Sequence, residues 1–172
     1  MARTYLALAL VSLSALAAAK DIPNPLIDYG AFQSGVERVG AVREQRRVTE
    51  FEFVHMAGDP STVILDARSA EKFALLHVRG AKNLSLPDIT EPELAKLIPS
   101  KQTRILIYCN NNFTNEPQAF PAKSDAASLN VYTMNVLFAY GYTNVYELGP
   151  LVDIRKSIIP FDRGEALAQV TR

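Results

Sequence analysis

The chain has 172 residues, of which 48% are hydrophobic and 21% are charged, a composition typical of a globular protein. Basic and acidic residues number 18 each, so the formal net charge is zero, which excludes bulk attraction to nucleic acid or to an anionic membrane. The single cysteine, Cys109, excludes an internal disulfide framework and is either an inert buried thiol or a reactive one.

The first residues have the three-part pattern of a secretory signal peptide. Arg3 gives a positive start, Tyr5 to Leu16 is almost wholly apolar, and Ala17 to Ala19 matches a small-residue cleavage site. The apolar run is shorter than the roughly 20 residues that a membrane span needs, and no cysteine stands at the cleavage point to carry a lipid. We therefore expect residues 1–19 to be removed and the protein to be exported, to the periplasm or outside the cell, with no membrane anchor. A buried N-terminal helix is the alternative.

Residues 20–40 contain prolines and glycines with weak periodicity, so we expect a partly irregular N-terminal extension over 20–45. Residues 47–48 fit a short edge strand. Thr49 and Glu52 form a capping-box pattern, which predicts a helix through Met56. Ser69 predicts the start of another helix over 70–76, and residues 90–93 form a second capping-box pattern whose helix ends before Pro99.

Two unbroken apolar runs, 62–65 and 104–108, indicate strands that are buried on both faces, and 144–148 is a further strand. A helix with regular apolar spacing, 129–140, precedes the last strand and should end at Gly141. Strands that alternate with helices predict an α/β fold, a three-layer sandwich in which helices cover both faces of a mostly parallel sheet. Ligands of such sheets bind at the carboxyl ends of strands, where Cys109 lies. This position favours a reactive thiol over an inert one.

Four segments in order resemble the rhodanese-like family. They are Asp66-Ala67-Arg68 after the first buried strand, the His-x-x-Gly-Ala-x-Asn pattern of His77 to Asn83, Tyr108-Cys109 at a strand end, and Gly141 to Gly149. The resemblance covers about 47–151 and implies the rhodanese-like fold. It also implies a sulfurtransferase that takes a sulfane sulfur onto Cys109 as a persulfide and passes it to a thiol or to cyanide. The implied domain spans 46–155, with a C-terminal tail at 156–172.

In this family the six residues from the cysteine curl into a cradle of backbone amides, and here they are Cys109, Asn110, Asn111, Asn112, Phe113 and Thr114. A free thiol is only about 3% ionised at pH 7, and a ring of amides would favour the thiolate and the persulfide anion. Asparagine tolerates the positive φ that a tight cradle needs, and the Thr114 hydroxyl would donate to the persulfide. An ordinary polar turn is the alternative.

The loop has no basic residue, which disfavours thiosulfate as donor, and an insertion at about 115–124 follows it. This insertion would either leave the dipole of the following helix less well aimed at the sulfur or form a lid, with Phe113 and Phe120 as walls and Lys123 as the missing cation. Asp66 and Arg68 fit a structural pair, although Arg68 is also a candidate for the substrate pocket. His77 fits a structural histidine at a helix end, and the two histidines with one cysteine make no plausible metal site, so neither a metal nor another cofactor is expected.

Two other functions stay open. A cysteine phosphatase on a related fold needs an arginine six residues after the nucleophile, where this chain has Asn115. A non-catalytic binding module, or a carrier of persulfide for a partner, fits the neutral loop and the insertion. The sequence indicates small sulfur donors and acceptors as partners, not nucleic acid, and it says nothing about the oligomeric state.

Overall fold

A computed structural model describes residues 22–164, so the predicted signal peptide, 1–19, and the last eight residues of the predicted tail lie outside the described residues. The described α-helices are α1 (Tyr29–Arg43), α2 (Glu50–Ala57), α3 (Ala70–Leu75), α4 (Glu91–Leu97) and α5 (Leu129–Ala139). The strands are β1 (Arg47–Val48), β2 (Val63–Asp66), β3 (His77–Val78), β4 (Lys82–Asn83), β5 (Ile105–Tyr108), β6 (Phe113–Thr114), β7 (Val145–Leu148), β8 (Val152–Asp153) and β9 (Phe161–Asp162). Four short 3-10 helices lie between them: η1 (Glu44–Arg46), η2 (Leu86–Asp88), η3 (Asn110–Asn112) and η4 (Asp125–Ala127).

The central sheet has five strands in the order β1-β7-β5-β2-β4, and all of its neighbouring pairs are parallel. The strands β2 and β5 in its middle are buried at every position, because helices cover both faces and no side chain can reach water. The predicted edge strand at 47–48 is confirmed as β1. Two small ladders add to the sheet, an antiparallel pair of β3 with β9 and a parallel pair of β6 with β8.

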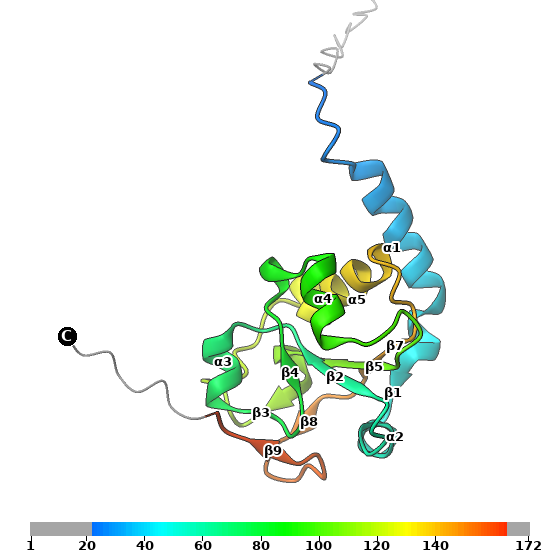
Figure 1. Ribbon diagram of the computed structural model, residues 1–172. Helices are drawn as coiled ribbons and strands as arrows, with labels where there is room; N and C mark the ends of the chain where they lie inside the picture. The colour runs from blue at the N-terminus through cyan, green and yellow to red at the C-terminus, as the bar shows by residue number, and fades with distance from the viewer. Residues whose placement is uncertain (1–21, 165–172) are drawn as a thin grey trace, which may run out of the picture.

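Helices lie on both sides of the sheet in Figure 1, and alternate residues of β5 contribute to two cores. Leu106 and Tyr108 pack in one core with residues of α2, of the insertion and of the segment before β9. Ile105 and Ile107 pack in the other core with residues of α1, α4 and α5. The predicted three-layer α/β sandwich is therefore confirmed.

The caps predicted from the sequence set several helix ends. Thr49 and Glu52 form the complete reciprocal capping box at the start of α2. At α4 only half of the predicted box is present, because the Thr90 side chain accepts from the Glu93 amide with no reciprocal bond. Gly141 ends α5 with φ +81°, a backbone conformation that glycine adopts without steric cost.

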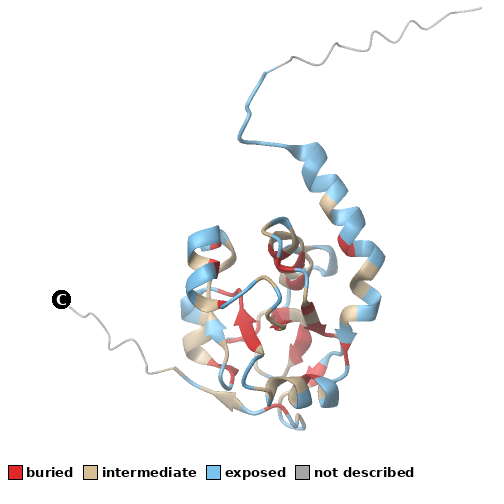
Figure 2. Cartoon of the chain, turned by 45° about the vertical axis from the view of Figure 1, so that its right-hand side comes forward, coloured by how far each residue is buried: buried red, intermediate tan, exposed pale blue. Residues whose placement is uncertain are grey.

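The N-terminal extension differs from the prediction, because residues 29–43 form the 15-residue helix α1. Asp28 caps this helix by accepting from the Ala31 amide at 2.8 Å, and Val39 is its one buried residue. Three glycines weaken the intrinsic helix propensity and the apolar periodicity, so the pattern was hard to read. Most of the helix is exposed, as the pale blue colour of its ribbon in Figure 2 shows. Within 22–164, no helix combines the length and hydrophobicity that a membrane crossing requires.

The insertion after the cysteine loop is anchored in the core, so the prediction that Phe113 and Phe120 form the walls of a lid is wrong. Ala119 and Phe120 are buried, and the Phe120 ring packs against Phe113 with a centroid distance of 4.6 Å and also lies near Tyr108 and Phe161. The predicted C-terminal tail also contributes to the domain, because β9 pairs with β3. The aromatic contacts of Phe120 hold the insertion against the core, and the sequence pattern did not reveal them.

Candidate functional site

Cys109 follows the last residue of β5, at the carboxyl edge of the parallel sheet where the sequence predicted it. The residue is buried, with 1% of its surface exposed, and its Sγ atom lies 3.4 Å from the Ser128 hydroxyl. Ser128 is the residue before α5, and its side chain caps no amide of that helix. The sulfur therefore lies beside the N-terminus of an 11-residue helix, whose dipole favours negative charge there.

The six residues that were expected to form a cradle divide into a 3-10 turn and a short strand. Asn110–Asn112 make one turn of 3-10 helix, and Phe113–Thr114 are extended and pair with β8. The Asn112 amide donates to the Cys109 carbonyl at 3.2 Å, and the Phe113 amide donates to the Asn110 carbonyl. The Phe113 amide is therefore engaged by a carbonyl group, whereas Cys109 and Asn112 form a reciprocal cap in which the Asn112 amide also faces the Cys109 side chain. The asparagines also have negative φ, since the one non-glycine residue with positive φ among those described is Asn115, at 69°.

Asn112 fixes the turn that carries Cys109. Its side-chain oxygen accepts from the Cys109 amide at 2.8 Å and from the Asn130 side chain at 3.1 Å. Its side-chain nitrogen donates to the Leu148 carbonyl at 2.7 Å. This one buried amide therefore ties the cysteine to both α5 and β7. The sequence indicated a polar turn here but gave no sign of these two distant partners.

A pocket of about 410 Å³ includes Cys109, Asn111, Asn112 and Ser128 among its lining residues. Its volume lies in the range of about 300–1,000 Å³ that is typical of small-molecule sites. Charged side chains from other elements complete the wall: Arg43 of α1, Arg47 of β1, Asp125 of η4 and Glu147 of β7. Sequence reasoning missed these charged residues and Ser128, because only the fold brings them to the carboxyl edge of the sheet.

Arg68 has a structural role and does not line this pocket, so the prediction that it binds substrate is not supported. Its guanidinium group forms a buried ion pair with Asp66 and donates to the carbonyls of Leu76 and Ala119 at 2.8 Å each. It also lies 4.1 Å from the centre of the Phe120 ring. The predicted Asp66–Arg68 pair is therefore present, and it joins the sheet to the insertion.

Three other predicted contact residues also lie away from the pocket wall. Phe113 is buried in the aromatic core, and the Thr114 hydroxyl donates to the Val152 carbonyl at 3.4 Å. Lys123 is exposed, and its backbone carbonyl and amide bond to the Asn111 side chain at 2.8 and 2.9 Å. Asn111 and Asn112 line the pocket, whereas Asn110 is buried beside it in the same turn.

His77 is a structural residue, as its position at a helix end predicted. Its ring stacks on Phe73 at 3.8 Å between centroids, and its Nδ1 atom lies 2.8 Å from the Phe73 carbonyl. Both contacts hold the chain where α3 ends and β3 begins.

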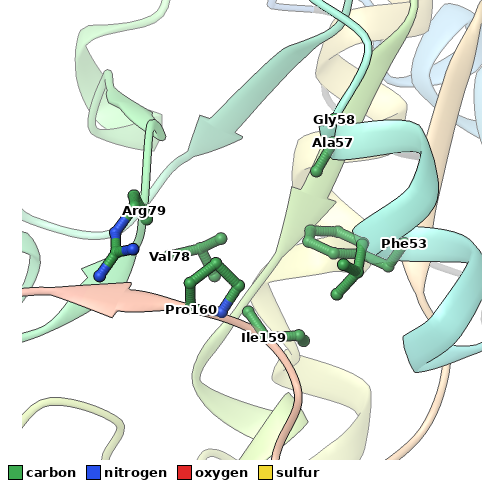
Figure 3. A pocket seen from close by; sticks show the side chains of 8 residues that line it. Phe53, Ala57, Gly58, Val78, Arg79, Ile159 and Pro160 are labelled. Carbon is green, nitrogen blue, oxygen red and sulfur yellow. The ribbon is translucent and has the colours of Figure 1, made fainter.

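A second cavity, of about 330 Å³, lies between α2, β3 and the segment before β9. Figure 3 shows Phe53, Val78, Ile159 and Pro160 around it, with the guanidinium group of Arg79 turned away. This cavity is mostly apolar and contains no nucleophile, so the candidate site is the pocket that Cys109 lines.

Glu147 is a buried carboxyl group in the wall of the cysteine pocket, with 1% of its surface exposed. Burial raises the pKa of Glu147, and the guanidinium groups of Arg43 and Arg47 oppose this rise only in part. The nearer arginine nitrogen, of Arg43, lies 2.7 Å from its Oε1 atom, and that of Arg47 lies at 3.4 Å. The second oxygen, Oε2, has no hydrogen-bond partner.

The raised pKa of Glu147 predicts a pH effect on stability. Its favourable contribution is fully present below the ordinary value of 4.5 and is lost as pH rises through the higher folded-state pKa. Relative to Glu147→Gln, the wild-type protein should therefore become less stable as pH rises from acid toward neutral. Chemical denaturation of both proteins across this range measures the difference. A difference that grows in favour of the wild type would show that the two arginines outweigh the cost of burying the charge.

The comparisons with known proteins agree with this architecture. The model of the rhodanese-like domain matches residues 51–149. The chain is 18% identical to the rhodanese-like domain of an Anabaena protein, covering 74% of this chain and 85% of that one with a TM-score of 0.51. It is 24% identical to an E. coli rhodanese solved with anions, covering 60% of this chain and 99% of that one with a TM-score of 0.42. No curated protein sequence matches the chain at a significant level.

The family model spans more than half of the chain, and the mostly parallel sheet agrees with the fold of the Anabaena domain. The chain therefore belongs to the rhodanese-like domain family, as the four sequence motifs indicated. This family contains sulfurtransferases as well as domains without catalytic activity. Whether this chain is catalytic therefore depends on the geometry of its own cysteine pocket.

Proposed function

We propose that the protein is a rhodanese-type sulfurtransferase in which Cys109 accepts a sulfane sulfur as a persulfide and passes it to a thiophilic acceptor. The observation that carries this proposal is the contact of 3.4 Å between the Cys109 Sγ atom and the Ser128 hydroxyl at the start of α5. A hydroxyl donor and a helix N-terminus both favour a thiolate, which is the nucleophilic form of cysteine. The Ser128 hydroxyl and the N-terminus of α5 thus support the stabilisation of negative charge on sulfur that the family's amide cradle was expected to provide.

In the first half-reaction the Cys109 thiolate attacks the outer sulfur of the donor. A new S–S bond forms at Cys109, the bond between the outer sulfur and the donor breaks, and the donor leaves with the electron pair. In the second half-reaction a thiolate or cyanide attacks the outer sulfur and restores the Cys109 thiolate. No outside oxidant or reductant is consumed, because the transferred sulfur keeps its oxidation state over the cycle. The Ser128 hydroxyl donates to the sulfur that carries negative charge.

Asn111 and Asn112 contribute to this site in different ways. Asn111 lines the pocket, is partly exposed and holds the end of the insertion in place. Asn112 positions the cysteine through its amide bonds. We assign no direct contact with substrate to Arg68, Phe113, Thr114 or Lys123.

A non-catalytic binding or persulfide-carrier module is the second candidate. The burial of Cys109, with 1% exposed, and the engagement of the Phe113 amide by a carbonyl favour it. A carrier would accept sulfur on Cys109 but release it only to a partner protein. A binding module would not accept sulfur at all.

Export is a further part of the proposal, and it rests on the signal-peptide pattern of residues 1–19 alone. In an oxidising compartment a free thiol is exposed to oxidation, and the burial of Cys109 offers protection. The proposed partners are small sulfur donors and acceptors that enter the pocket.

Intact mass measurement of the purified protein tests this proposal. After treatment with a sulfane sulfur donor, the wild-type protein should gain the mass of one sulfur atom, and Cys109→Ser should gain nothing. Adding cyanide or a small thiol should then remove the added sulfur at a rate that matches turnover. An adduct that small acceptors cannot remove would identify a carrier, and the absence of any adduct would overturn both sulfur-based roles.

A further inference from the structure

The charges around the cysteine pocket balance one another. Arg43 and Arg47 contribute two positive charges, and Asp125 and Glu147 contribute two negative ones. Glu147 bonds to both arginines, and Glu44 contacts both as well, at 3.9 and 3.2 Å. Because the asparagines after Cys109 are neutral, the pocket offers no net positive field to a small dianion.

The charged groups differ in how far they reach solvent. The Arg43 and Arg47 side chains are 31% and 40% exposed, and Asp125 is exposed. Cys109 and Glu147 lie deeper, each with 1% of its surface exposed. The charged groups of the wall that a ligand meets in solvent are therefore the two guanidinium groups and the Asp125 carboxylate.

Two polar groups in the pocket wall are buried and have an unpartnered acceptor atom. Asn130 is 4% exposed, and its Oδ1 atom has no hydrogen-bond partner, although its side-chain nitrogen donates to Asn112. The Oε2 atom of Glu147 is also buried and has no hydrogen-bond partner. Buried acceptors without partners are costly, so they indicate a site that is completed by a ligand that donates hydrogen bonds.

We propose that this pocket selects a zwitterionic amino-acid persulfide as its sulfur donor and disfavours an inorganic dianion such as thiosulfate. The inference rests on the proposed function and specifies its substrate class. The donor's α-carboxylate pairs with the exposed edges of Arg43 and Arg47, and its α-ammonium group pairs with Asp125. Asp125 and Glu147 are then specificity-determining residues, because they set the charge that the donor meets.

In the transfer step the donor reacts in its protonated form, R–S–SH. The Cys109 thiolate attacks the outer sulfur, the donor's S–S bond breaks, and the amino-acid thiolate leaves with the electron pair. The proton stays on the outer sulfur, which is now bound to Cys109. The leaving thiolate takes up a proton from water.

Matched donors test the inference, because cysteine persulfide and N-acetylcysteine persulfide share the same S–S chemistry and differ at the ammonium group. We expect cysteine persulfide to load Cys109 about fivefold faster, the size of effect typical of one partly exposed ion pair. Asp125→Asn should bring this ratio close to one and should raise the rate with thiosulfate. Asp88→Asn is the control, since Asp88 is also an exposed carboxylate in a 3-10 helix and lies outside the pocket wall.

A second variant tests the same charge effect at another residue of the pocket wall. Glu147→Gln should also raise the rate with thiosulfate relative to cysteine persulfide, because it removes a negative charge from the pocket. Equal loading by the two persulfides in the wild type, or an unchanged ratio in Asp125→Asn, would overturn the substrate assignment while leaving the sulfurtransferase proposal intact. If no donor loads Cys109, the proposed function itself fails.

Discussion

Replacing Arg68 with alanine should lower the free energy of unfolding by about 3–5 kcal/mol, the usual cost of breaking a buried ion pair from one side. Arg68 is 2% exposed, and Asp66, its partner, is fully buried. The variant would leave the Asp66 carboxylate without its cation and the Leu76 and Ala119 carbonyls without their donor. Lysine should not restore stability, because it lacks the planar fork that reaches all three groups.

Urea or guanidinium denaturation measures this effect, and the ion pair of Arg79 with Asp162 is a matched control. In both pairs the arginine Nε atom lies 3.0 Å from the aspartate Oδ1 atom, but the side chains of Arg79 and Asp162 are 62% and 43% exposed. Arg79→Ala should therefore cost at most about 1 kcal/mol. If Arg68→Ala were as mild as Arg79→Ala, the pair would not be holding the insertion against the sheet.

Replacing Asn112 with alanine should disable sulfur loading and also destabilise the protein. The change leaves the Cys109 amide, the Leu148 carbonyl and the Asn130 side chain without a partner. Each buried polar group left unpaired costs about 1–3 kcal/mol, so a total loss of at least 3 kcal/mol is expected. Because Asn112 positions the turn, we expect loading of Cys109 to slow by more than tenfold, the effect of a small misplacement of reacting groups.

The rate of persulfide formation should be measured at a temperature where Asn112→Ala is still folded. Asn111→Ala is the control, because that side chain is partly exposed and bonds only to the backbone of Lys123. It should change stability by less than Asn112→Ala and should retain measurable loading. Normal loading by folded Asn112→Ala would show that the turn does not depend on this amide.

Local signals predicted the central part of the fold. The unbroken apolar runs at β2 and β5 indicated buried parallel strands, and the capping box at Thr49 and Glu52 marked the start of α2. These signals depend on neighbours in the sequence or on burial of whole strands, so they can be read without the fold. Cys109 could be placed at the sheet edge for the same reason.

Features that depend on distant contacts could not be predicted. The loop after Cys109 passes into β6 at Phe113, because the Phe113 and Phe120 rings pack together in the aromatic core. The helix α1 is held by a single buried residue, Val39, and by the ion pair of Arg43 with Glu147, neither of which has a local pattern. Lys123 was expected to supply the positive charge of the site, whereas the arginines of α1 and β1 line its wall.

The contact of Ser128 with Cys109 had no signal in the sequence. Ser128 stands directly before the regular apolar spacing of α5, which is the usual place of a helix cap. In the structure its hydroxyl lies beside the Cys109 sulfur and caps no amide. Only the return of α5 to the carboxyl edge of the sheet, after the insertion, brings the two side chains together.

We propose that the Cys109 sulfur reacts with solutes in the folded protein, and alkylation under native conditions decides whether it does. Cys109 is the only thiol in the chain, so the uptake of iodoacetamide reports on this one atom. We predict that the folded protein is alkylated at a rate set by thiolate reactivity, and that Ser128→Ala slows it. Alkylation that occurs only when the protein unfolds would contradict the account, because it would show that the sulfur is sealed in the native state.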